Sequence, residues 1–247
     1  MELLFVPVAC WLPYDSSSGI LYYFAWLSEY YVIVETTLCT IGNTVLFLRV
    51  AEDIIYELKM LTSLLKNAKC RADMIMKQNS LEFKDNKNKY FTFNLRLCLT
   101  QCVKHHKAIT RIFVLLNDLY NYSLLAILLL SVYMLCLCGI MFTSDEVEFA
   151  PKLQFAFFLS GEIVHVFIYC WYGQKLIDLS GELSDVLYFT DWFNYSSDIK
   201  GHLLMLQVRC LRELKLSVGG FMEASFNTFS NLMNSAYSYY NVMQASQ

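Results

Sequence analysis

Charge is the first property that this sequence has little of. Only 17% of its 247 residues are charged and 56% are hydrophobic, whereas soluble globular domains average about 25% charged and roughly 45–50% apolar residues. Too few charges remain to cover the surface of a soluble domain of this size. The chain also has only 3 Pro and 9 Gly, too few for a turn-rich β protein, while 16% of its residues are aromatic. This composition favours packed helices that face lipid or an apolar ligand.

The sequence also lacks the motifs of several common enzyme and metal sites. It contains no glycine-rich phosphate loop, no Cys-x-x-Cys pair and no His-Glu-x-x-His motif. Its nine cysteines are odd in number and scattered, so they predict no secreted disulfide framework. His105 and His106 are adjacent and point to different faces of a helix, which favours a structural role over zinc binding. We therefore expect no enzyme, no cofactor, no metal site and no nucleic-acid partner.

Four stretches are long and apolar enough to cross a bilayer, which takes about 20 residues in a helix. They are residues 21–48, 120–142, 153–172 and 219–243. The first is longer than a span requires and is expected to continue as a helix beyond the membrane. The last carries many Ser, Thr and Asn residues, so water or other helices must solvate part of it. The predicted fold class is all-α, a polytopic transmembrane helix bundle with long cytosolic helical extensions.

The distribution of basic residues predicts the orientation of the spans. Thirteen of the 19 Lys and Arg fall in the connection 49–119, which the positive-inside rule places in the cytosol. Segments 1–20, 143–152 and 244–247 together hold one Lys and are predicted to lie outside. Alternation then places 173–218 in the cytosol and the C-terminus outside the cell. Segment 1–20 makes a poor signal peptide and is interpreted as the end of a preceding span, so the chain looks truncated at its N-terminus.

Helical periodicity continues into the cytosolic connection. Apolar residues recur at helical spacing at both of its ends, at Ile54, Leu58, Leu61 and Leu65 and again at Leu95, Leu99, Cys102, His106, Ile109 and Phe113. Both stretches predict amphipathic extensions of the flanking spans, whereas the polar segment 77–89 predicts an exposed, mobile connection. A further cytosolic helix is predicted over about 181–216, and the pair Gly219–Gly220 predicts a break before the last span.

Four short motifs follow one another along the chain. The first three are Leu12-Pro-Tyr-Asp15, Val103-Lys-His-His-Lys107 and Trp171-Tyr-Gly-Gln174. The fourth and longest is Gly219-Gly-Phe-Met-Glu-Ala-Ser-Phe-Asn-Thr-Phe-Ser-Asn-Leu-Met-Asn-Ser-Ala-Tyr-Ser-Tyr-Tyr240. Together they resemble the insect odorant receptor family, whose closing signature the fourth motif matches over a Gly-rich turn and a Ser-Tyr-Tyr run.

The resemblance implies seven spans with the N-terminus inside and the C-terminus outside, which agrees with the orientation predicted from charge. The four spans here would be the family's fourth to seventh. One departure lies near the inner end of the first span, where the family often carries an Asp and this chain has Ile41-Gly-Asn-Thr-Val45, so a role for that acid does not carry over. The sister gustatory receptors end in a Thr-Tyr motif followed by Gln-Phe, whereas here Tyr237 follows Ala236 and Gln244 precedes Ala245. This difference favours the odorant branch.

The resemblance also implies where an odorant would bind. In the family the pocket lies in the outer half of the bundle, which carried onto this chain gives the candidates Trp26, Leu27, Tyr30, Tyr31, Val34, Phe158, Leu159 and Glu162. A mostly apolar, aromatic pocket suits volatile organic ligands bound by burial. The other interpretation is ordinary helix packing, in which aromatic stripes are also common.

A pore is implied for the last span, because the family's seventh span lines a channel of four subunits and narrows at a hydrophobic Val near its outer end. The matching positions here are Ser235, Ser238, Val242 and Ala245. An apolar ring of this kind can gate by dewetting. The alternative is a last helix that packs only against its own bundle.

Four ionisable residues fall inside predicted spans: Glu29, Glu35, Glu162 and His165. Such residues are costly in hydrocarbon and usually face a partner or a cavity. Glu162 and His165 are three positions apart and share a helix face, so they can pair with each other. They form either a satisfied polar pair between helices or part of a ligand-accessible cavity.

We predict an odorant receptor subunit of a ligand-gated, non-selective cation channel. The partners implied by the resemblance are small volatile odorants, membrane lipid and the olfactory co-receptor, joined in a hetero-oligomer that is expected to be tetrameric. The expected location is the plasma membrane of olfactory sensory neuron dendrites, as a multi-pass protein. The alternatives are a gustatory receptor of the same superfamily, a non-channel membrane protein such as a transporter or metabotropic receptor, and a truncated product that does not function alone.

Overall fold

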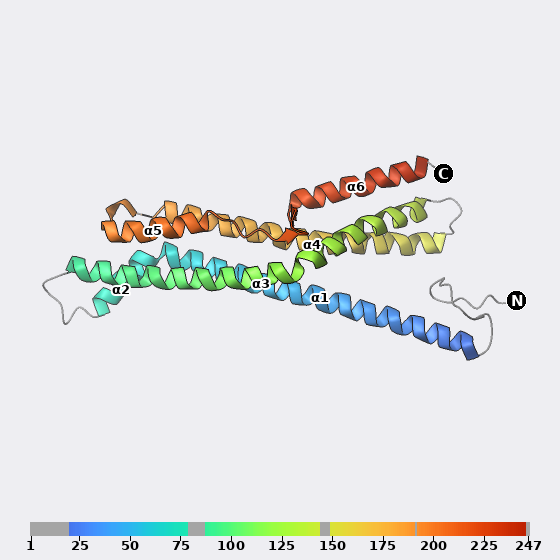
Figure 1. Ribbon diagram of the computed structural model, residues 1–247, viewed down its shortest axis with the longest axis horizontal. Coiled ribbons are helices and arrows are strands. Elements are labelled where there is room, and N and C mark those ends of the chain that lie inside the picture. The colour runs from blue at the N-terminus through green and yellow to red at the C-terminus, as the bar shows by residue number, and fades with distance from the viewer. Residues whose placement is uncertain (1–19, 79–86, 144–148, 191, 246–247) are drawn as a thin grey trace. The chain divides into compact units, whose positions relative to one another are not determined.

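The computed structural model describes residues 20–78, 87–143, 149–190 and 192–245, and most of them are helical (Figure 1). The predicted segment 1–20 lies outside the described residues except for its last position. So do residues 79–86 of the predicted connection, 144–148 of the predicted extracellular turn and 246–247 of the tail. The chain divides into two compact units, 1–50 and 51–247.

The first unit contains the beginning of helix α1 (Ile20–Lys66), which continues into the second unit. No proline interrupts this helix, so the prediction that the first span continues as a helix beyond residue 48 is confirmed. Four threonines donate hydroxyl hydrogen bonds to carbonyls four residues earlier, at 2.7–2.9 Å: Thr36, Thr37, Thr40 and Thr44. Such internal pairing removes the cost of placing these hydroxyls in hydrocarbon.

The second unit contains the rest of α1, α2 (Ala68–Gln78), α3 (Lys87–Thr143) and α4 (Phe149–Tyr188). The amphipathic extensions predicted from spacing are confirmed, because their apolar residues are buried at Ile54, Leu58, Leu61 and Leu65 and at Leu95, Leu99, Cys102, Ile109 and Phe113. The polar connection is shorter than predicted. Residues 77–78 still belong to α2 and residues 87–89 already belong to α3.

The prediction of one cytosolic helix over 181–216 is wrong. Helix α4 ends at Tyr188, a single 3-10 turn covers Trp192–Asn194, and helix α5 covers Ser197–Cys210. The intervening Thr, Asp, Asn and Ser residues favour caps and turns over helix interiors, which accounts for the break. The break lets α5 turn back along α3 and α4 (Figure 1), where Ile199, Leu203 and Leu206 are buried.

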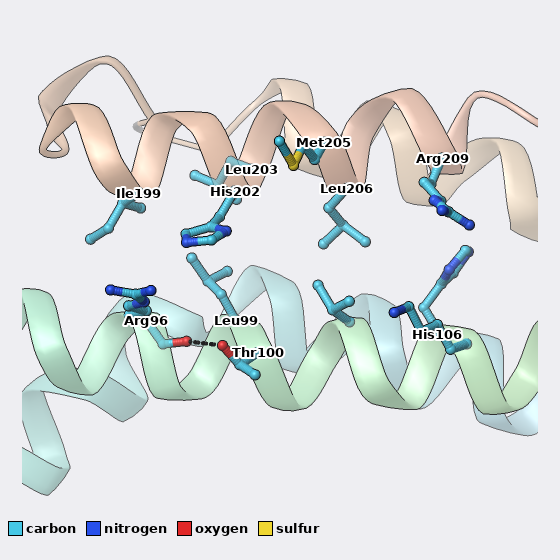
Figure 2. A pocket seen from close by; sticks show the side chains of 12 residues that line it. Arg96, Leu99, Thr100, His106, Ile199, His202, Leu203, Met205, Leu206 and Arg209 are labelled. Carbon is cyan, nitrogen blue, oxygen red and sulfur yellow. Dashed lines mark hydrogen bonds between the residues drawn. The ribbon is translucent and has the colours of Figure 1, made fainter.

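Polar pairs join the helices of the second unit in the part of the chain predicted to be cytosolic. The Tyr172 hydroxyl on α4 donates to Glu52 on α1 at 2.8 Å. The imidazole of His105 lies 2.7 Å from the Glu57 carboxylate, which gives that histidine the structural role predicted for it. A cavity of about 320 Å³ separates the facing side chains of α3 and α5 (Figure 2).

The end of the chain departs from a plain helix. A two-stranded antiparallel ladder of β1 (Ser217–Val218) and β2 (Met222–Glu223) precedes helix α6 (Phe226–Ala245). The predicted span 219–243 is therefore wrong over its first seven residues, because the helix begins only at Phe226. Among the described residues, α1, α3 and α4 are long and apolar enough to cross a membrane, by length and composition alone. Helix α6 is not among these three, in keeping with its many polar residues.

Candidate functional site

The hairpin before α6 is built on the glycine pair that predicted a break. Its register pairs Ser217 with Glu223 and Val218 with Met222. Gly219 and Gly220 in the loop have φ values of 66° and 83°, a backbone region that side chains with a Cβ rarely adopt. The break is confirmed, and its form is a tight reversal of the chain between α5 and α6.

Two asparagines on α3 hold this hairpin. The side-chain carbonyl of Asn117 accepts a hydrogen bond from the Ser217 backbone N–H at 2.7 Å, and that of Asn121 accepts one from Gly220 at 3.1 Å. The Gly219 N–H also donates to the backbone carbonyl of Asn121 at 3.1 Å. The two side chains are four residues apart and so lie on one face of α3. Neither residue was among the predicted site residues, although their spacing within an apolar stretch was a visible signal.

Helix α4 holds the other side of the hairpin through a glycine. A Cβ at Gly173 would lie 2.2 Å from the Ala224 carbonyl oxygen and 2.8 Å from the Ala224 Cβ. No ordinary contact is that short, so only glycine lets the backbone of residue 224 approach α4 this closely. The Ala224 N–H donates to the Leu216 carbonyl at 2.8 Å, which closes the hairpin below the ladder. The start of α6 is thus fixed between α3 and α4.

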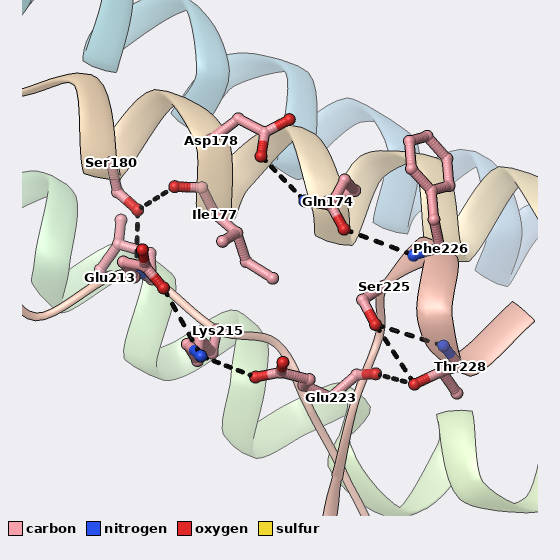
Figure 3. Close-up of polar contacts among 11 residues, drawn as sticks. Gln174, Ile177, Asp178, Ser180, Glu213, Lys215, Glu223, Ser225, Phe226 and Thr228 are labelled. Carbon is pink, nitrogen blue, oxygen red and sulfur yellow. Dashed lines mark hydrogen bonds and ion pairs between the residues drawn. The ribbon is translucent and has the colours of Figure 1, made fainter.

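Ser225 caps the N-terminus of α6 (Figure 3). Its hydroxyl accepts a hydrogen bond from the Thr228 N–H at 3.3 Å, and the Thr228 hydroxyl donates to the Glu223 carbonyl at 2.6 Å. The Gln174 side chain on α4 accepts a further bond from the Phe226 N–H at 3.4 Å. These contacts satisfy orphan donors at the helix start, so the position at which α6 begins is well defined.

A lysine beside the hairpin connects the strand ends (Figure 3). The Lys215 ammonium lies 3.1 Å from Glu223 and 3.5 Å from Glu213. The hydrogen bond to Glu223 is the main reason that the pKa of Lys215 is raised, and Glu213 raises it further. Both ion pairs of Lys215 are exposed, and exposed ion pairs contribute little to the stability of a fold. Their effect is to orient the hairpin.

Helix α6 has one packed face and one open face. The packed face meets α3 and α4: Ala236 is buried, and the Tyr240 hydroxyl donates to Thr143 at 3.2 Å. The opposite face forms a stripe, here called the open stripe, whose exposed residues follow helical spacing: Asn227, Asn231, Ser235, Ser238, Val242 and Ala245. All four predicted pore residues belong to it, and the Val242 side chain is 68% exposed. A groove of about 610 Å³ runs along its first half, beside Glu223, Asn227 and Asn231.

The predicted ligand-binding residues fall in both units. In the first unit, Trp26, Leu27, Tyr30, Tyr31 and Val34 are all exposed, and the rings of Trp26 and Tyr30 stack 5.7 Å apart. In the second unit, Phe158 is exposed while Leu159 and Glu162 are partly buried on α4. The first five candidates thus belong to one unit and the last three to the other.

Glu162 has the partner that its spacing predicted and a second one that it did not. Its carboxylate lies 4.0 Å from the His165 ring on the same helix and accepts a hydrogen bond from the Ser131 hydroxyl on α3. This arrangement matches a satisfied polar pair between helices. Within the described parts of the chain, no cluster of three or more His, Cys, Asp or Glu side chains has the geometry of a metal site.

Comparison with known proteins gives one consistent family. A sequence profile described as "7tm Odorant receptor" matches residues 4–237. Putative odorant receptor 85d of Drosophila melanogaster is 22% identical over 97% of this chain and 54% of its own length. Odorant receptor 85f of the same fly is 29% identical over 49% of this chain and 31% of its own length. The odorant receptor coreceptor of Anopheles gambiae is 23% identical over 60% of this chain and 31% of its own length.

A solved structure has the same fold. The insect olfactory receptor OR5 from Machilis hrabei, in complex with eugenol, superposes with a TM-score of 0.80 over 96% of this chain and 56% of that protein, at 13% identity. Its likeness shows the fold alone. In these alignments, this chain spans between about a third and just over half of the length of the relatives and of the solved structure.

Proposed function

This chain belongs to the seven-transmembrane odorant receptor family, and from that premise we propose that it forms part of an odorant-gated, non-selective cation channel whose pore α6 lines. The family consists of membrane-embedded, multi-pass receptors and not of enzymes. The proposal concerns the receptor that contains this chain, assembled with its other subunits.

The open stripe of α6 is the observation that carries the proposal. A helix that faced lipid on its free side would present apolar residues there, because Asn side chains are costly in hydrocarbon. Ser235 on the stripe donates to the Asn231 carbonyl at 2.8 Å, so this cost comes from the side chains of Asn227 and Asn231. Four of the six residues of the open stripe are polar, and the exposed Tyr237 and Tyr239 lie outside it. Water is the medium that best solvates this stripe. A water-filled pore between copies of α6 supplies it.

Val242 is the proposed gate. It is the one large aliphatic residue in the open stripe and it lies near the outer end of the helix. A ring of such residues narrows a pore with an apolar constriction that excludes water when it is tight and conducts when it widens. Small movements of α6 therefore suffice to open and close it.

The ligand is proposed to be a volatile organic molecule bound in the outer half of the bundle. The exposed aromatic residues of α1 and the mixed surface of α4 around Phe158 and Glu162 offer apolar area and a few polar groups. Sites of that composition bind small apolar ligands chiefly by burial. Glu162 already pairs with Ser131 and His165, so its proposed role is to shape the pocket edge.

The proposed topology keeps the cytosolic connection inside and the C-terminus outside. The partner is an olfactory co-receptor in a tetrameric hetero-oligomer, in the plasma membrane of olfactory sensory neuron dendrites. Glycosylation provides a test, because Asn194-Tyr-Ser196 is a sequon in a segment proposed to be cytosolic. No glycan is expected there, and a glycan found at Asn194 would contradict this orientation.

Cysteine accessibility tests the pore. Ser238→Cys places a thiol on the open stripe, and Ala236→Cys places one on the packed face two residues away; both changes are small. In the receptor expressed with its co-receptor, a charged thiol reagent should block odorant-evoked current through Ser238→Cys and leave Ala236→Cys unaffected. The assignment of α6 to the pore would be wrong if both variants were equally sensitive to the reagent. It would also be wrong if Ser238→Cys stayed insensitive after mass spectrometry had verified its labelling.

A further inference from the structure

The cavity between α3 and α5 has the shape of a small-molecule site. It measures about 320 Å³, at the lower end of the range of roughly 300–1,000 Å³ for such sites. Its central surface is apolar, formed by Leu99 and Val103 from α3 and by Leu203 and Leu206 from α5. Figure 2 shows side chains of the two helices directed toward one another across it. It lies in the proposed cytosolic part of the chain and is separate from α6.

The two polar ends of this cavity differ in charge. At one end, the Arg96 guanidinium lies 3.2 Å from the Asp198 carboxylate, which is also 3.7 Å from the ring of His202. The Asp198 carboxylate therefore neutralises the positive charge of Arg96 at that end. At the other end lie His106, Lys107 and Arg209. Among the described residues, no carboxylate forms an ion pair with Lys107 or Arg209.

Other features of the charged end agree with a positive field there. The acidic residue nearest in sequence to Arg209 is Glu213, four residues further on and beyond the end of α5, and its ion pair is with Lys215. Figure 2 shows His106 and Arg209 pointing toward each other from opposite helices. Burial lowers the pKa of His106, and the charge of Arg209 lowers it further. A neutral imidazole beside two cations can donate a hydrogen bond to an anion without adding repulsion between them.

We propose that this cavity binds a soluble phosphate monoester with a small apolar group, the phosphate between Lys107 and Arg209 and the apolar group against Leu206. A guanidinium and an ammonium on opposite sides match the oxygens of a phosphate, and charge-assisted hydrogen bonds of this type are the strong ones. The apolar surface favours an organic phosphate over the inorganic ion. This inference goes beyond channel function and names a cytosolic ligand.

Position along α3 favours a soluble ligand over a lipid headgroup. Lys107 lies 13 residues before Tyr120, where the predicted span begins. At 1.5 Å per residue this places the cavity about 20 Å from the membrane core along the helix. A lipid phosphate would have to leave the headgroup layer to reach Arg209, whereas a soluble molecule enters from the cytosol.

Calorimetric titration with phenyl phosphate tests the proposal on the purified receptor that contains this chain, held in nanodiscs of phosphatidylcholine. Saturable binding is expected, with inorganic phosphate binding more weakly. Arg209→Gln should weaken phenyl phosphate binding about 10-fold or more, the loss expected for one charge-assisted contact. The matched control is Arg212→Gln, which removes the same charge three residues away, outside the cavity lining, and should leave the affinity unchanged.

A second pair of variants tests the same site independently, in case Arg209→Gln does not fold. Lys107→Gln should weaken binding while Lys104→Gln, on the same helix and outside the lining, should not. Absence of saturable binding, or equal losses in a variant and its control, would overturn the site. Nanodiscs with added phosphatidylinositol bisphosphate distinguish a lipid headgroup from a soluble phosphate as the ligand. If this lipid competes with phenyl phosphate for the cavity, the proposal of a soluble ligand is wrong and the ligand is a lipid. Binding is measured without current, so failure here leaves the proposed channel function standing.

Discussion

Gly173→Ala is the substitution whose effect the structure defines most directly. The added Cβ would lie 2.2 Å from the Ala224 carbonyl oxygen, whereas ordinary contacts begin near 3.4 Å. The backbone of residue 224 must therefore retreat from α4 by about 1.2 Å, taking with it the Ser225 cap and the first turn of α6. Because the atoms that clash belong to the backbone, no side-chain rotation relieves them.

The expected cost follows from measured overpacking in other proteins. Inserting a methyl group into a closed contact costs typically about 1–3 kcal/mol. For a domain of this size each kcal/mol lowers the melting temperature by roughly 2–4 °C, so a fall of about 2–12 °C is expected in detergent. The displaced start of α6 should also alter channel opening, seen as a changed resting current relative to the odorant-evoked current.

Gly161→Ala is the matched control, because it makes the same change in the same helix at a position with nothing within 4 Å of the new Cβ. There the substitution should be neutral or stabilise the helix by up to about 1 kcal/mol. Thermal unfolding of both variants, followed by size-exclusion chromatography after heating, measures the difference. Equal melting temperatures for the two variants would refute the close packing of the hairpin against α4.

Three further substitutions test the hairpin, the gate and the pocket. Asn117→Ala removes the acceptor of the Ser217 N–H and should lower the free energy of unfolding by about 1–2 kcal/mol, and an unchanged melting temperature would contradict that hydrogen bond. Val242→Ser should hydrate the gate and raise the resting current at normal surface expression. If resting current, ion selectivity and blocker sensitivity all stay the same, Val242 is not on the pore axis. Tyr30→Ala should change odorant sensitivity or ranking, and unchanged dose–response curves across a broad panel would argue against the pocket assignment.

Much of the architecture could be predicted from the sequence because it depends on local patterns. Helical spacing of Leu58, Leu61 and Leu65 predicted a buried cytosolic extension, and low charge predicted the membrane class. The glycine pair predicted a break because its backbone conformation is a local property. The residues of the open stripe share one face of α6 for a local reason too, since the 3.6-residue period of a helix sets which side chains lie together. Their assignment to a pore is a proposal that came from the family resemblance.

The tertiary structure decided what depends on residues far apart in the chain. Asn117 lies 100 residues before the backbone group that it holds, and nothing in its own neighbourhood indicates that partner. The same is true of Gly173, whose need to be glycine arises from the approach of Ala224, and of α5, whose turn back along α3 opposes Arg209 to His106. Local sequence sets which face of each helix is apolar or polar. Only packing brings two faces together, and it thereby creates the hydrogen bond of Asn117, the close contact at Gly173 and the cavity beside α5.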